Sequence, residues 1–186
     1  MSTTLTKTAI TDAAIEQTTT AFRRLSAELD ALATDPDALL ARLGELAQDL
    51  RFEHIDLDTT WRLGCLLRAV AAAEALPVAI DIQFGPQRVF HAALPGASAD
   101  NDGWAARKGA VAARFNDSSL AVGVLFDRDH GGFDTAARLP VADYAAHGGA
   151  LPLQLPSGIG VGVAAVSGLP SIHDHALVAA AIATIV

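Results

Sequence analysis

Apolar side chains recur at helical spacing in the first part of the chain. Leu39, Leu43 and Leu46 form one apolar stripe. Asp35 and Pro36 precede this stripe, and an aspartate N-cap followed by proline is typical of a helix start. The pattern predicts helices over residues 21–32 and 36–50, and a third helix from residue 56 or 58 to residue 76.

Beyond residue 76 the hydrophobic period shortens to that of β-strands. Strands are predicted at residues 78–84, 88–94, 151–155 and 159–166, the first two joined as a hairpin through Gly85-Pro86-Gln87. Helices are predicted at residues 98–115 and 171–186, while residues 121–126 fit either a strand or the end of a helix and residues 127–149 are rich in loop formers. Helices that alternate with hairpins predict an α+β fold, in which helices cover antiparallel strands.

Composition and charge narrow the class of protein. With 186 residues, 51% of them hydrophobic, the chain has the material for one domain, which we place at residues 21–186. Residues 1–20 are polar and rich in threonine, so we expect a flexible or frayed segment there. The formal charge of −8 argues against nucleic-acid binding, because phosphate contacts require a basic surface.

The compartment follows from what the sequence lacks. No apolar run reaches the roughly 18 residues that a membrane span needs, and no secretion signal is apparent, so we expect neither membrane insertion nor export. The single cysteine, Cys65, cannot form an intrachain disulfide. These features favour the cytoplasm.

The predicted helix over residues 98–115 carries the first candidate site. Trp104, Lys108, Val111 and Phe115 lie on one face at helical spacing, and a lysine on an apolar stripe is unusual. Lys108 either lays its stem on Trp104 while the ammonium reaches water, or binds an anion within a pocket. Arg107, on the neighbouring face, is either a clamp for a carboxylate or phosphate or an ordinary surface arginine.

A second candidate is the segment His147-Gly148-Gly149 ahead of the predicted strand at residue 151. Glycines let the backbone approach a ligand closely, and the neighbouring histidine has the chemistry of a ligand or an acid/base group. The alternative is a turn histidine that bonds to local backbone. A similar triplet, His130-Gly131-Gly132, lies among charged residues and is typical of a solvated loop tip.

The third candidate is the turn between the last predicted strand and the last helix, where Ser167 ends the strand. Ser171 and Asp174 have the spacing of a capping box, which explains Asp174 without any function. His173 and His175 point in different directions on a helix, so we expect no metal site. His175 is close to a helix N-terminus, which favours the neutral imidazole.

Taken in order along the chain, these motifs resemble those of the haem-degrading-domain family, the HbpS-like family. The resemblance begins near Ala38. From there on, the sequence is similar to the small uncharacterised bacterial and fungal branch of the family. It is carried by Trp104, Arg107-Lys108, Phe115, Ser118-Ser119, the segment 146–149 with Pro152, the segment 166–170, and Asp174-His175. The resemblance implies a profilin-like sandwich with a central antiparallel sheet, assembled as a homo-oligomer of dimers or rings of dimers.

The residues and the resemblance together leave three hypotheses about activity. The first is a protein that binds haem or a similar anionic small molecule, for which His147 and His175 are the candidate iron ligands and Arg107 and Lys108 the partners of the propionates. The second is an enzyme on a small anionic substrate that uses Lys108 with a histidine. The third is an oligomeric adaptor without catalysis. The candidate ligand-binding residues are Trp104, Arg107, Lys108, His147, Gly148, Gly149, Ser167 and His175.

Overall fold

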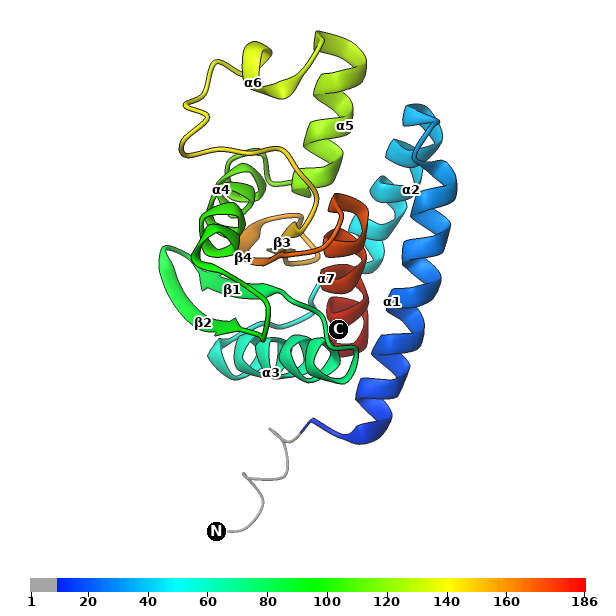
Figure 1. Ribbon diagram of the computed structural model, residues 1–186, viewed down its shortest axis with the longest axis vertical. Coiled ribbons are helices and arrows are strands. Elements are labelled where there is room, and N and C mark those ends of the chain that lie inside the picture. The colour runs from blue at the N-terminus through cyan, green and yellow to red at the C-terminus, as the bar shows by residue number, and fades with distance from the viewer. Residues whose placement is uncertain (1–9) are drawn as a thin grey trace.

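The computed structural model describes residues 10–186, and within them it has the expected α+β architecture (Figure 1). The elements in chain order are α1 (Asp12–Leu32), α2 (Pro36–Asp49), α3 (Leu57–Ala73), β1 (Ala79–Phe84), β2 (Gln87–Ala93), α4 (Ala99–Phe115), α5 (Ser119–His130), α6 (Phe133–Ala136), β3 (Ala150–Gln154), β4 (Gly160–Ser167) and α7 (Ser171–Ile185). The fold class predicted from the sequence is therefore confirmed.

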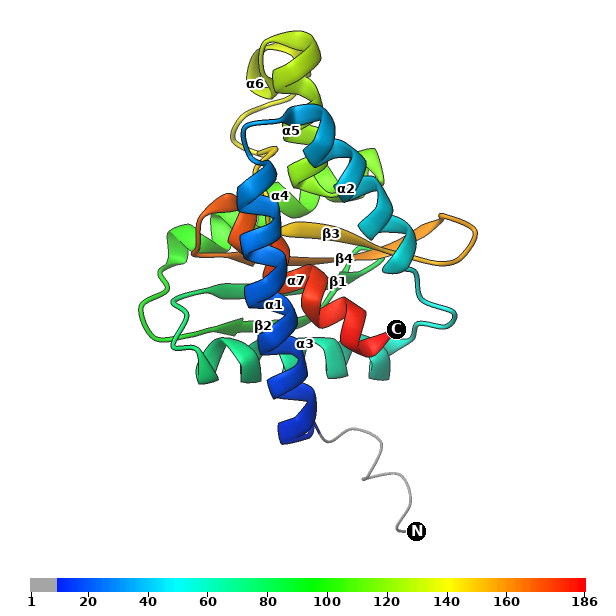
Figure 2. The same cartoon turned by 90° about the vertical axis from the view of Figure 1, so that its right-hand side faces the viewer.

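The four strands form one antiparallel sheet in the order β2-β1-β4-β3. Helix α4 covers one face, while α3 and α7 pack on the other (Figures 1 and 2). The alternation of a strand explains the two faces: Ile80 and Ile82 belong to the core beneath α3 and α7, whereas Val163 and Ala165 pack against alanines of α4. Small side chains on that second face let α4 approach the sheet closely.

Helix α7 is the centre of the larger core. Residues 174–182 are all buried, because the sheet lies on one side of the helix and α1 runs along its other side (Figure 1). A helix that is apolar nearly all round requires such enclosure. None of the helices within residues 10–186 combines the length and the apolar character needed to cross a membrane.

The start of α1 corrects one prediction. The helix begins at Asp12 rather than at residue 21, so residues 12–20 are helical instead of flexible or frayed; residues 1–9 lie outside the described part of the chain. Thr11 caps the helix by accepting a hydrogen bond from the Ala14 N–H. Thr18 is fully buried and its hydroxyl lies 2.9 Å from that of Thr184 in α7. Threonine is a weak helix former, so packing against α7 stabilises this segment.

Helix α5 settles an ambiguity in the sequence. Residues 121–126, which fitted a strand or a helix end, lie inside a helix that continues to His130, and α6 follows within the expected loop region. Ser118 caps α5 by accepting from the Ala121 N–H, and Gly131 ends it in the left-handed conformation. A short apolar run cannot distinguish a strand from a buried helix by its period alone.

The packing of α3 on the sheet gives a first testable prediction. A Cβ added at Gly64 would lie 2.3 Å from the ring of Phe90, which is itself held by an edge contact with Trp61. We expect Gly64→Ala to lower the free energy of unfolding by about 1–3 kcal/mol, the usual cost of overpacking a core. Urea unfolding of both proteins measures the difference.

Gly44 in α2 is the matched control, because nothing lies within 4 Å of the position its Cβ would take. Gly44→Ala should raise the free energy of unfolding by about 0.5–1 kcal/mol, since alanine is the better helix former. Effects of the same sign and size at both glycines would contradict the packing role assigned to Gly64.

Candidate functional site

An open cleft of about 280 Å³ lies between α4 and the turn that joins β4 to α7. We call it the Trp104 cleft. Its lining residues are Asp100, Asn101, Trp104, Lys108, His147, Ser167, Gly168, Leu169, Ser171 and Asp174. The structure thus brings together residues from all three candidate segments of the sequence.

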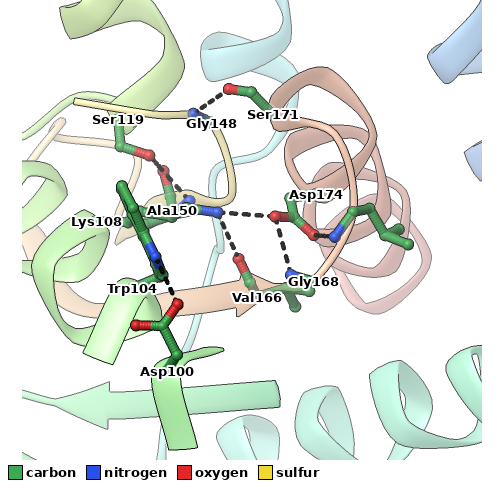
Figure 3. Close-up of polar contacts among 11 residues, drawn as sticks. Asp100, Trp104, Lys108, Ser119, Gly148, Ala150, Val166, Gly168, Ser171 and Asp174 are labelled. Carbon is green, nitrogen blue, oxygen red and sulfur yellow. Dashed lines mark hydrogen bonds and ion pairs between the residues drawn. The ribbon is translucent and has the colours of Figure 1, made fainter. Parts of the chain in front are cut away.

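A buried ion pair forms the floor of the Trp104 cleft (Figure 3). The Lys108 ammonium lies 2.7 Å from the Asp174 carboxylate, and the two side chains are only 5% and 1% exposed. Lys108 also donates to the Val166 carbonyl at 3.3 Å. The expectation that the ammonium reaches water is therefore wrong, because the helix directs it inward onto Asp174.

Asp174 has a second role, which replaces the predicted capping box. Its carboxylate accepts from the N–H groups of Gly168 and Leu169, at 3.3 and 3.0 Å, and so closes the turn before α7. No side chain caps α7, and the Ser171 hydroxyl instead accepts from the Gly148 N–H at 2.6 Å. Burial raises the pKa of the Asp174 carboxyl, while Lys108 and the two N–H groups act in the opposite direction.

The loop that carries His147 is fixed from both sides. The bond from Gly148 to Ser171 ties it to α7, and the Ala150 N–H donates to the Ser119 hydroxyl of α5 at 3.0 Å. At Gly149 φ is +127°, and a Cβ would lie 2.4 Å from the Val166 carbonyl oxygen. Glycine is therefore required where the loop crosses the ion pair.

Trp104 and His147 form one wall of the cleft. Their rings meet edge to face, with 5.3 Å between centroids, and the indole N–H donates to Asp100 at 3.1 Å. The Arg107 guanidinium stacks on the indole ring, 4.0 Å from its centroid, and is not among the residues that line the cleft. Asp100 lies one helical turn before Trp104, so helical spacing could have identified it from the sequence.

A second hollow, of about 370 Å³, adjoins the first at His147 and Ser171, which line both. We call it the α5–α6 hollow. Its other lining residues are Leu120, Gly123, Val124, Asp127, Gly131, Gly132, Phe133, Asp134, Thr135 and Ala146. Sequence patterns did not indicate this hollow, because it depends on the end of α5 and on α6, which lie in a region predicted to be rich in loops.

His175 lies apart from this group, although the sequence grouped it with Lys108 and His147. The ring is only 2% exposed, and it lines a small chamber against α2 and β3 rather than the Trp104 cleft. Consecutive residues of a helix point about 100° apart, so Asp174 facing the cleft turns His175 away from it. Burial lowers the pKa of His175 to about 4, so the imidazole is neutral at pH 7.

Comparison with known proteins matches the sequence of this chain to a family. A family model described as haem degrading protein HbpS-like matches residues 55–183. A UPF0303 protein of Streptomyces avermitilis is 44% identical over 133 residues, which are 72% of this chain and 82% of that protein. A UPF0303 protein of Streptomyces coelicolor is 43% identical over 153 residues, which are 81% of this chain and 96% of that protein.

Solved structures show the same fold. The crystal structure of the Ybr137w protein superposes with a TM-score of 0.75 at 25% identity, covering 84% of this chain and 92% of that one. The crystal structure of HbpS superposes with a TM-score of 0.56 at 16% identity, covering 70% and 89% of the two chains. The two superpositions support the assignment of the fold.

The residues present meet only part of what a haem requires. Iron needs a positioned axial ligand, and the propionates are best held by cations. His147 offers an imidazole where the two hollows meet, but Lys108 is already neutralised by Asp174. The remaining charged groups are the carboxylates Asp100, Asp127 and Asp134, so haem as a whole does not fit. Residues 10–186 also hold no cluster of three or more His, Cys, Asp or Glu side chains arranged for a metal ion.

The buried ion pair gives the second testable prediction. Lys108→Met and Asp174→Asn should each lower the free energy of unfolding by about 3–5 kcal/mol, because each leaves the other group buried without its counter-charge. The double variant should cost less than the sum by about 1–3 kcal/mol. Urea unfolding of the four proteins measures this coupling.

The exposed pair Arg23–Glu74, at 2.8 Å, is the control for that cycle. Its coupling, measured with Arg23→Met and Glu74→Gln, should stay below about 1 kcal/mol because water screens it. Additive losses at Lys108 and Asp174 would show that the ion pair is not the link between α4 and α7.

The buried imidazole gives a third prediction. Between pH 6.5 and 4 the unfolded chain binds a proton at His175 that the folded chain does not, so stability falls as the pH falls. We expect this residue to account for a loss of about 3 kcal/mol over that range. His175→Leu removes the titrating imidazole. The difference in free energy of unfolding between this variant and the wild type should therefore change by about 3 kcal/mol between pH 6.5 and 4. Parallel curves for the two proteins would contradict the assignment.

Proposed function

The chain belongs to the HbpS-like family of haem-degrading proteins, and we propose that within it the chain binds a small molecule in the two hollows that meet at His147. The observation that carries this proposal is the rigid support of the site. The Lys108–Asp174 pair and the Gly148–Ser171 bond fix the walls, while the Trp104 and His147 rings remain available to a ligand. Sites held in this way are typical of binding proteins.

The charges of the hollows indicate what kind of molecule they hold. Lys108 contributes no net charge because Asp174 balances it, whereas Asp100 lines the Trp104 cleft, and Asp127 and Asp134 line the α5–α6 hollow. A carboxylate-lined site favours a cation and opposes an anion. The proposed ligand is therefore a small planar molecule that is cationic, not the anionic molecule expected from the sequence.

Binding is better supported than catalysis. An acid/base site needs groups that can exchange protons with a substrate. Lys108 is committed to Asp174, and His175 faces a different chamber, so the combination of Lys108 with two histidines does not form. The structure leaves His147 as the imidazole of the cleft.

The fourth prediction tests the charge of the ligand with matched planar probes, benzamidine as the cation and benzoate as the anion. The chain has two tryptophans, so Trp61→Phe leaves Trp104 as the fluorescent reporter. Benzamidine should quench Trp104 saturably and bind at least about tenfold more tightly than benzoate. Asp100→Asn, which keeps the acceptor for the indole N–H, should reduce this preference. Equal affinities, or a preference unchanged by Asp100→Asn, would contradict the proposal.

Haemin is the counter-probe in the same experiment. Because the hollows lack free cations for the propionates, the Soret band of added haemin should be the same with the wild type and with His147→Ala. A Soret shift that is lost in His147→Ala would show that haem binds through His147 and would overturn the choice of ligand. The cytoplasmic location of the protein stays a prediction from the sequence.

A second proposal concerns assembly, because α3 carries an exposed apolar surface next to the free edge of β2. Leu57 and Trp61 lie one helical turn apart and are 54% and 50% exposed. Such a surface beside an edge strand is suited to contact with a second copy of the chain.

The fifth prediction tests that contact by light scattering coupled to size-exclusion chromatography. Trp61→Glu should lower the molecular mass of the assembly, because it places a charge within the apolar surface. Ile159→Glu, at a 62% exposed loop position far from α3 in the sequence, is the control and should leave the mass unchanged. An unchanged mass for Trp61→Glu would exclude this surface as the interface.

A further inference from the structure

A small chamber of about 30 Å³ lies between α2, β3 and the start of α5, and it shares no lining residue with the Trp104 cleft. We call it the His175 chamber. Its lining residues are Leu43, Leu46, Ala47, Leu50, Asp117, Ser118, Leu151, Pro152, Gln154 and His175. Leucine, alanine and proline side chains make up most of the wall, so the chamber is mainly apolar.

The imidazole of His175 has no hydrogen-bond partner in this chamber. Neither Nδ1 nor Nε2 bonds to any atom of residues 10–186, although the side chain is almost wholly buried. A neutral imidazole has one N–H donor and one nitrogen acceptor. Buried polar atoms are nearly always paired in folded proteins, so a pair of unpartnered nitrogens indicates an occupant.

The other polar side chains of the wall bond to nearby backbone groups. The Ser118 hydroxyl accepts from the Ala121 N–H at 3.1 Å, and Gln154 donates to the Asn116 carbonyl at 2.8 Å. The Asp117 carboxylate accepts from the Ser118 N–H at 2.6 Å. None of them bonds to His175 in this arrangement of residues 10–186. A molecule from outside the chain can therefore supply the partner.

We propose that the His175 chamber binds a short-chain alcohol, whose hydroxyl bonds to the imidazole of His175 and whose alkyl group packs on the leucines. A hydroxyl both donates and accepts, so it can pair with either ring nitrogen of the neutral imidazole, one at a time. A water molecule needs roughly 10–15 Å³ of such volume, so the chamber suits about two or three heavy atoms. A charged molecule of this size would lose its hydration against an apolar wall.

This site is separate from the Trp104 cleft, because Asp174 and His175 point about 100° apart on α7 and line different spaces. The test uses the full chain with ¹³C-labelled leucine methyl groups and ¹⁵N-labelled histidine, observed by NMR while ethanol is added. We expect saturable shifts at Leu43, Leu46, Leu50 and Leu151 and at the ring nitrogens of His175, with a Kd on the order of 1–100 mM for so small a ligand. Acetate and ethylammonium, the charged molecules of similar size, should cause no such shifts.

Two variants separate the contribution of the His175 hydrogen bond to ethanol binding from that of the chamber volume. His175→Leu keeps the volume but removes the hydrogen bonds, so the Kd for ethanol should rise at least about tenfold. Ala47→Leu places extra carbon atoms against the chamber and should abolish the shifts while His175 stays in place. Unchanged affinity in both variants would overturn the proposal. Shifts that grow linearly to roughly 1 M ethanol, or that spread over the whole chain, would show that the chamber holds water only.

Discussion

The ion pair between Lys108 and Asp174 is the contact on which the geometry of the site depends. It joins α4, on one face of the sheet, to α7, on the other, and its carboxylate also closes the turn between β4 and α7. Burying two charges costs hydration, which is recovered only where each charge meets its partner and further hydrogen bonds. The pair therefore favours the relative position of the two helices in which the Trp104 cleft is formed.

The sequence was sufficient for those parts of the fold whose signals are local. Asp35 and Pro36 mark the start of α2, and alternating apolar residues mark the hairpin of β1 and β2, because caps and strand periods act over a few residues. The start of α1 could not be found in this way. Thr18 is helical because it is buried against α7, a partner more than a hundred residues away along the chain.

The sequence could predict which residue types form the candidate site, but not the directions in which their side chains point. Trp104, Lys108 and His147 are candidate binding residues on sequence grounds, and all three line one cleft. Whether the Lys108 ammonium points to water or to a carboxylate depends on where α7 lies, which no local pattern contains. The same reason explains His175: spacing places it beside Asp174, but only the packed helix shows that the two neighbours face different spaces.

The enclosure of α7 also bears on the order in which the protein forms during synthesis. Since the sheet and α1 both pack against this helix, neither can bury its inner surface fully until residues 171–185 have left the ribosome. Every other element described is made earlier, and domains complete their folding only when all their parts are available. The nascent chain must therefore keep apolar surface of the sheet and of α1 exposed until α7 emerges, and that interval is when binding by a chaperone would matter most.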